Sequence, residues 1–204
     1  MGGSEANHAA GAAGAPATRI LGVDPGSVVV GWGCLDVSVR SPAAAAPRQP
    51  PVALRARNVV AGPGRGSIVR LTDRGLLRLG SRSAPLADRL LALAQGIAAL
   101  LERLRPDELA LEEAFYGKSV QSAMRIGEAR GVILAEACRR GVVVHQFAPA
   151  RIKRVVAGNG AATKDAVAAM TGQLLGVRMP GERDVTDALA VALCCVEARR
   201  GAGR

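Results

Sequence analysis

The sequence predicts an α/β fold, because segments with strand patterns alternate with segments of helical periodicity. Residues 19–33 contain a short apolar run, a Pro-Gly turn and a glycine-spaced return run, which together predict an antiparallel hairpin. Leucine and isoleucine recur at helical spacing across residues 85–103. Residues 107–113 then alternate between apolar and polar side chains, as a strand does. These three observations indicate a sheet with helices packed against it.

The length and composition predict one folded domain with a tail. The chain has 204 residues, 49% of them hydrophobic, which is enough for a sizeable core. Residues 1–18 are rich in alanine and glycine and lack leucine, isoleucine, valine and aromatic residues, so we expect a disordered tail there. We expect a single domain over residues 19–200, with an Arg/Pro-rich insertion around residues 38–67. No membrane segment or signal-peptide pattern is found, so the expected location is the cytoplasm.

The charge of the chain favours a polyanionic partner. There are 27 Lys and Arg residues against 17 Asp and Glu, a formal net charge of +10, which favours nucleic acid ahead of an anionic membrane. A general preference of the proteome for arginine is the alternative explanation. Only Lys118, Lys153 and Lys164 are lysines. Because lysine offers a compact charge that arginine does not mimic, these three are candidate phosphate contacts.

Four acidic residues stand at positions where a metal site is possible. Asp24 ends the first strand, Glu112 ends a later strand, and Asp184 and Asp187 lie three apart in the first turn of the last helix. Each has an ordinary alternative role, as a turn residue or as a favourable charge at a helix start. Four carboxylates together in a basic protein require a cation, and hard oxygen ligands select Mg²⁺ or Mn²⁺. Two such ions serve in-line attack at phosphate.

Several other residues have both a functional and a structural interpretation. Phe115 directly follows the acidic strand end, so it either stacks on an exposed base or packs against the next helix. Gly127 and Gly131 lie four apart in the helix predicted over residues 119–140, which indicates close contact with the sheet or with a second subunit. His145 is expected to be structural. The cysteines lack metal-type spacing, so small buried thiols are expected at these positions: Cys34, Cys138, Cys194 and Cys195.

Together these segments resemble the RuvC family of Holliday junction resolvases, within the RNase H-like superfamily. The resemblance extends over most of residues 19–196 and is carried by RILGVDPGS, LEEAFYGKS, SAMRIGEARGVILAEA, RIKRVVAGNGAATKDAV and DVTDALAVAL. It implies a five-stranded mixed β-sheet flanked by α-helices, a homodimer, and work with the RuvA and RuvB branch-migration proteins. It also implies roles for particular residues: a catalytic and metal-binding tetrad of Asp24, Glu112, Asp184 and Asp187, a junction-contacting Phe115, and basic Lys153 and Lys164 near the cleaved strand.

The expected function is therefore a structure-selective endonuclease that resolves Holliday junctions in homologous recombination and DNA repair. By the resemblance it nicks two strands of like polarity symmetrically, uses two Mg²⁺ ions per subunit for which Mn²⁺ substitutes, and leaves 5′-phosphate and 3′-hydroxyl ends. Two alternatives stay open. One is a junction-binding protein without nuclease activity. The other is an actin-like ATPase or kinase, because GVDPGS is similar to the first phosphate motif of that superfamily.

Overall fold

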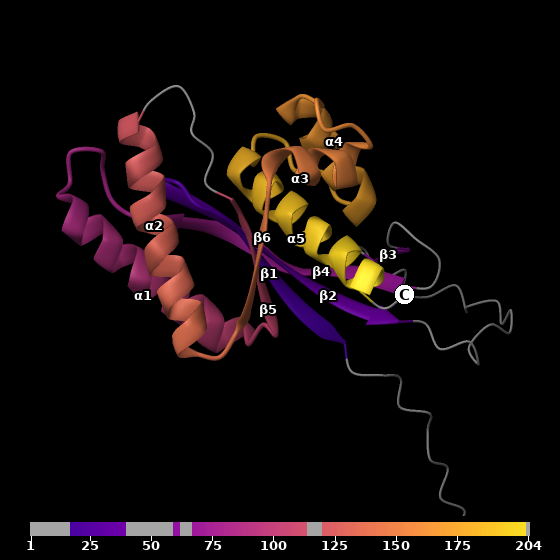
Figure 1. Ribbon diagram of the computed structural model, residues 1–204, viewed down its shortest axis with the longest axis horizontal. Coiled ribbons are helices and arrows are strands. Elements are labelled where there is room, and N and C mark those ends of the chain that lie inside the picture. Colours follow the sequence, from indigo (N-terminus) through magenta and orange to yellow (C-terminus); the bar gives the residue numbers. More distant parts are fainter. Residues whose placement is uncertain (1–16, 40–58, 62–66, 114–119, 203–204) are drawn as a thin grey trace, which may run out of the picture.

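A computed structural model of the chain describes residues 17–39, 59–61, 67–113 and 120–202. They form one sheet with helices on both faces (Figure 1). The strands are β1 (Thr18–Asp24), β2 (Val29–Val39), β3 (Val59–Ala61), β4 (Ser67–Arg78), β5 (Glu108–Glu112) and β6 (Val143–Phe147). The helices are α1 (Leu86–Leu104), α2 (Val120–Arg139), α3 (Pro149–Ala157), α4 (Lys164–Leu175) and α5 (Arg183–Ala202). Most of the expected tail and most of the expected insertion lie outside the described residues.

The sheet is mixed, as predicted, with the strand order β3-β4-β2-β1-β5-β6. β1 pairs antiparallel with β2, which pairs antiparallel with β4, whereas β1, β5 and β6 run parallel. The five longer strands agree with the predicted five-stranded sheet, and the three-residue strand β3 adds a short sixth strand at the edge next to β4. Since β3 is so short, five long strands carry the sheet, and the switch to parallel pairing occurs at β1 and β5.

The two faces of the sheet bury separate apolar cores. α1 and α2 cover one face, and α3, α4 and α5 cover the other (Figure 1). Side chains alternate along β1, so Leu21 and Val23 enter the α1–α2 core while Ile20 enters the core beneath α5. Within the described residues, no helix is long and apolar enough to cross a lipid bilayer.

Three glycines let α5 lie directly on β1 and β2. A Cβ on Gly22 would lie 2.1 Å from the carbonyl oxygen of Ala188, and one on Gly31 would lie 2.0 Å from that of Asp184. A Cβ on Gly33 would lie 2.3 Å from the side chain of Leu189. Any side chain at these positions would push the helix away. The missing side chains therefore decide where the first turns of α5 sit relative to the end of β1.

The glycines of α2 have the opposite surroundings. A Cβ on Gly127 or Gly131 would meet no described atom of another element within 4 Å, so of the two neighbours considered from the sequence, the sheet and a second subunit, the sheet is not in close contact here. The same helix exposes two large apolar side chains, Val120 at 72% and Met124 at 64%. Cys138, also on α2, is exposed, contrary to the expectation of buried thiols, which holds for the other three cysteines.

The contact between α5 and the sheet predicts the effect of a single methyl group. Gly31→Ala should lower the free energy of unfolding by about 1–3 kcal/mol, because the added Cβ must displace the backbone of α5. Urea denaturation measures this change. Ser38→Ala, on the same strand, is the control and should stay within about 0.5 kcal/mol of the parent. Equal stability of Gly31→Ala and the parent would contradict the close approach.

Candidate active site

Two of the predicted carboxylates lie at the same edge of the sheet. Asp24 is the last residue of β1 and Glu112 the last residue of β5. These strands are parallel neighbours whose register pairs Val23 with Leu111, so the next residue of each strand is acidic. Val23 and Leu111 both face the α1–α2 core, which turns Asp24 and Glu112 toward α5. The alternation seen in the sequence thus brings both carboxylates to one face.

The start of α5 contributes the other two predicted carboxylates, Asp184 and Asp187. The backbone of Asp184 touches Gly31, and Gly31 is the residue opposite Asp24 in the β1–β2 pairing. Asp187 lies one turn further and, with Glu112, lines a cavity of about 60 Å³. Both aspartates of the i,i+3 pair therefore lie over the end of β1.

The raised pKa values of Asp24 and Glu112 reflect their burial and the nearness of the other acids. Burial raises the pKa of Asp24 to about 7, and the negative charges of Asp187, Glu112 and Asp184 contribute to the rise. Burial is also the largest cause of the raised pKa of Glu112, followed by the charge of Asp187. Carboxylates disfavour one another's ionisation only at short range. The four acids predicted from the sequence thus form one electrostatic cluster.

Two of the predicted lysines lie beside this cluster. The Lys164 ammonium is 3.3 Å from a carboxylate oxygen of Asp187, and the charge of Asp187 is the main cause of its raised pKa. Lys164 comes from the start of α4 and Lys153 from α3, and both line the 60 Å³ cavity with Glu112 and Asp187. The positive charges of both lysines lower the pKa of Glu112, which partly offsets its burial. Phe115 and Lys118 lie outside the described residues.

Arg130 is a neighbour of the cluster that the sequence analysis did not identify. It is buried on α2, and its charge acts to lower the pKa of Glu112. One guanidinium nitrogen donates to the side-chain oxygen of Gln146 on β6, while another is buried without a hydrogen-bond partner among the described residues. The sequence did contain a signal that could have identified Arg130. Arg130 stands between Ala129 and Ile133 on the buried face of an amphipathic helix, where a charged residue needs a partner.

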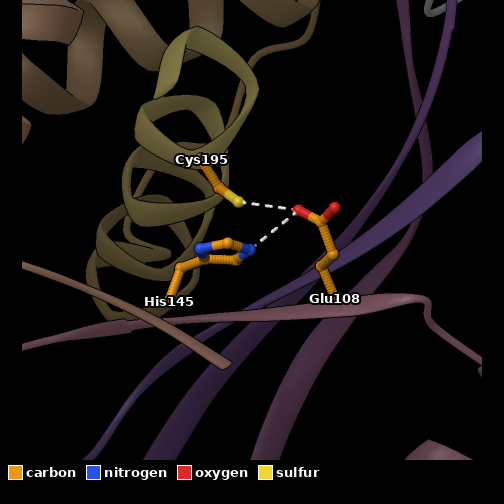
Figure 2. A group of neighbouring side chains, drawn as sticks. All are labelled: Glu108, His145 and Cys195. Atoms are coloured by element: carbon orange, nitrogen blue, oxygen red, sulfur yellow. Dashed lines mark hydrogen bonds and ion pairs between the residues drawn. The ribbon is translucent and has the colours of Figure 1, made fainter. Parts of the chain in front are cut away.

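A second polar cluster lies at the other end of β5 (Figure 2). Glu108 begins the strand that Glu112 ends. The thiol of Cys195 donates to one Glu108 oxygen over 3.2 Å, and His145 Nε2 lies 3.2 Å from the same oxygen without hydrogen-bond alignment. Arg199 forms an ion pair with the other oxygen.

The second cluster has atoms spaced as metal ligands are, but an arginine of the same chain already balances its negative charge. In the described part of the chain it is the one group of three His, Cys, Asp or Glu residues whose ligand atoms all lie within 4.8 Å of one another. Burial raises the pKa of Cys195 to about 12, so its sulfur stays a thiol. Arg199 already compensates the charge of Glu108. We therefore interpret the cluster as a structural link between β5, β6 and α5, which agrees with the structural role expected for His145.

The chain is similar to known proteins over most of its length. The family model for crossover junction endodeoxyribonuclease RuvC matches residues 57–195. The RuvC of Chloroflexus aggregans is 35% identical over 177 residues, which cover 86% of this chain and 91% of the relative. The RuvC of Halorhodospira halophila is 38% identical, with 87% and 89% covered.

A solved structure also resembles the chain. The structure of T. thermophilus RuvC in complex with Holliday junction substrate superposes with a TM-score of 0.68 at 28% identity. The similarity covers 90% of this chain and 96% of that one. It confirms the predicted RNase H-like fold.

The raised pKa of Asp24 predicts how pH changes the stability of the metal-free protein. The folded chain holds the Asp24 proton up to about pH 7, whereas the ordinary pKa is 3.8, so this group lowers stability as pH rises between those values. Asp24→Asn removes that loss. In EDTA it should be more stable than the parent at pH 8, by on the order of 1–3 kcal/mol, and nearly equal to it at pH 4.

Urea unfolding at the two pH values measures this difference. Asp165→Asn is the control, because its side chain is 84% exposed and lies outside the cluster. It should show no pH-dependent gain. A gain of the same size in both variants would mean that general charge, rather than the crowding of Asp24, is responsible.

Proposed function

The chain belongs to the RuvC family of crossover junction endodeoxyribonucleases, and we propose that it resolves Holliday junctions by nicking two strands of like polarity. The observation that carries this proposal is the cluster of carboxylates at the ends of β1 and β5 and the start of α5, with lysines beside it. The solved relative in complex with Holliday junction substrate supports four-way junction DNA as the substrate. The net charge of +10 suits such a polyanion.

The same cluster is proposed to hold the metal. Asp24, Glu112, Asp184 and Asp187 supply only hard oxygen donors, which fit Mg²⁺, with Mn²⁺ as a substitute. Their crowding supports this assignment, because burial and mutual repulsion raise the pKa of Asp24 and Glu112 and a divalent cation would relieve both. When bound, two such ions per subunit supply the positive charge that in-line hydrolysis of a phosphodiester requires, leaving 5′-phosphate and 3′-hydroxyl ends.

The chain's own residues prepare the site for this chemistry. Lys164 holds the Asp187 carboxylate by its ion pair and adds positive charge beside the cavity. Lys153 and Arg130 favour the ionised form of Glu112, the form that can ligate a cation. Lys153 and Lys164 are also proposed to contact the phosphates of the cleaved strand, and their position beside Glu112 and Asp187 supports this role. Phe115 and Lys118 remain proposed DNA contacts, with Phe115 stacking at the branch point.

The outer face of α2 supports the proposed homodimer. Val120 and Met124 are 72% and 64% exposed, and the helix surface at Gly127 and Gly131 is open. Glycines in a helix interior cost about 1 kcal/mol each relative to alanine unless a neighbour must approach closely. Within one chain, no described atom of another element lies within 4 Å of the place where a Cβ on Gly127 or Gly131 would be. A second copy of α2 would cover this surface, and two-fold symmetry would place two active sites on a four-way junction.

The wider setting follows from the family. We propose one nuclease domain over residues 19–200 that acts in the cytoplasm with the RuvA and RuvB branch-migration proteins, in recombination and repair. Neither alternative considered from the sequence, a junction-binding protein without nuclease activity or an actin-like ATPase, has an observation in its favour.

Neutralising any one carboxylate of the cluster should separate cleavage from binding. Asp24→Asn, Glu112→Gln, Asp184→Asn and Asp187→Asn should each lower the cleavage rate more than about 100-fold, since even removal of an indirect metal interaction costs about 10–100-fold. Junction affinity should survive, because each change also removes repulsion toward DNA. The assay is cleavage of a synthetic four-way junction beside linear duplex, in Mg²⁺ and in EDTA.

Glu113→Gln is the matched control, because Glu113 follows Glu112 but is exposed. It should cut at close to the parent rate. Cleavage near the parent rate by any of the four cluster variants would remove that residue from the metal site. Cleavage by the parent protein in EDTA would overturn the metal assignment itself.

A charge on the open face of α2 should separate the proposed dimer. Met124→Glu places two like charges in the interface and should shift the protein toward monomer at micromolar concentration, measured by sedimentation. Paired nicking should then become independent single nicking. Val143→Glu, at a 56% exposed apolar position on β6, is the control and should leave the assembly unchanged. A Met124→Glu protein that stays dimeric would place the interface elsewhere.

A further inference from the structure

An arginine-rich pocket lies on the other side of the turn that follows Asp24. The cavity has a volume of about 240 Å³ and lies among the β1–β2 turn, the segment before α1, α1 itself and the first turns of α2. None of the described residues that line it is acidic. Its lining includes Gly26, Ser27, Arg82, Arg89, Ser122 and Arg125.

Arg89 forms the inner wall of this pocket. Arg89 is only 5% exposed, and one of its guanidinium nitrogens donates a hydrogen bond to the backbone carbonyl of Ser27 over 2.6 Å. Its Nε is buried and has no hydrogen-bond partner among the described residues. Buried polar atoms are normally hydrogen-bonded, and a buried charge is normally paired. A cation held here without a carboxylate therefore suits an anion from outside the chain.

Arg82 and Arg125 form the outer rim. Both are exposed, and neither forms an ion pair within the described ranges. Elsewhere arginines do find acids: Arg19 and Arg70 bind Asp36, and Arg103 binds Asp73. Three guanidinium groups gathered without a compensating acid repel one another. Their repulsion is relieved when an anion binds between them.

We propose that this arginine pocket, defined by Arg82, Arg89 and Arg125, binds a backbone phosphate of the junction DNA. Guanidinium groups match the oxygens of a phosphate through paired, charge-assisted hydrogen bonds. The location favours DNA over a free anion, because Ser27 is only three residues beyond Asp24 in the same turn. A strand in the carboxylate cluster therefore passes close to the pocket. The pocket fixes how the junction is seated and takes no part in the chemistry. This inference rests on the proposed function.

The test measures junction affinity against salt in EDTA, where the proposed metal-dependent cleavage does not occur. Arg82→Gln/Arg125→Gln changes only exposed side chains and should fold normally. It should bind the junction about 10-fold or more weakly at moderate salt, and its log–log salt slope should be smaller by about 0.9 for each phosphate that the variant no longer neutralises. Arg105→Gln is the control, since it removes one guanidinium charge, against two in the double variant, from an exposed position at the far end of α1, and its slope should match the parent.

The outcomes are distinguishable. A double variant with the parent slope and affinity overturns the pocket proposal, whereas failure of the parent to cut a junction in Mg²⁺ overturns the proposed function instead. Equal weakening by Arg105→Gln would show a general charge effect and also overturn the pocket. Inorganic phosphate is the probe for a free-anion site. If it raises the melting temperature of the parent but not of the double variant, while junction binding is unchanged, the pocket serves a free anion and the DNA assignment is wrong.

Discussion

The direct contact between α5 and the first hairpin is the constraint on which the rest of the structure depends. Gly22 and Gly31 leave room for the backbone of α5 where any Cβ would collide with it. The contact fixes the height of the helix above the sheet and the position of its first turn along β1. Asp184 and Asp187 reach the end of β1 for that reason. A helix lifted by a layer of ordinary side chains would still bury its apolar face, but its acidic turn would no longer meet Asp24.

That contact creates an electrostatic problem which the surrounding elements partly solve. Burial raises the pKa of Asp24 and Glu112, and the negative charges of neighbouring carboxylates add to that rise. Lys164 on α4 and Lys153 on α3 reach the cluster from one face of the sheet, and Arg130 on α2 acts on Glu112 from the other. These positive charges reduce the repulsion without removing it. The remaining excess of negative charge favours a cation over a neutral ligand, in agreement with the metal proposed for this site.

The two ends of β5 show how neighbours decide the role of one residue type. Glu108 and Glu112 begin and end the same five-residue strand and both point toward α5. Burial and then the charge of Asp187 raise the pKa of Glu112, which is the proposed metal ligand. Glu108 meets Arg199, a thiol and an imidazole, so its charge is used to join β5, β6 and α5. Only the packing partners distinguish a proposed ligand from a structural acid.

The sequence by itself determined the features that depend on local pattern. An apolar run before a Pro-Gly turn placed Asp24 at a strand end, and alternation placed Glu112 at another. Helical spacing put Asp184 and Asp187 in one turn, and the combined motifs identified the family. These features were predictable because periods of two and 3.6 residues are set by backbone geometry alone.

Only the tertiary structure decided which side chains meet across the fold. It placed Arg130 near Glu112 and left Gly127 without a close neighbour among the described residues. It also brought three arginines around one pocket that no described acid lines: Arg82, Arg89 and Arg125. It also paired Cys195 with Glu108, 87 positions apart. Such contacts depend on strand register and on the distance between helix and sheet. A shift of one residue in the register would turn each side chain to the other face and change its partners. A local pattern carries no information about that distance, because it is set by the shapes of two surfaces far apart in the chain.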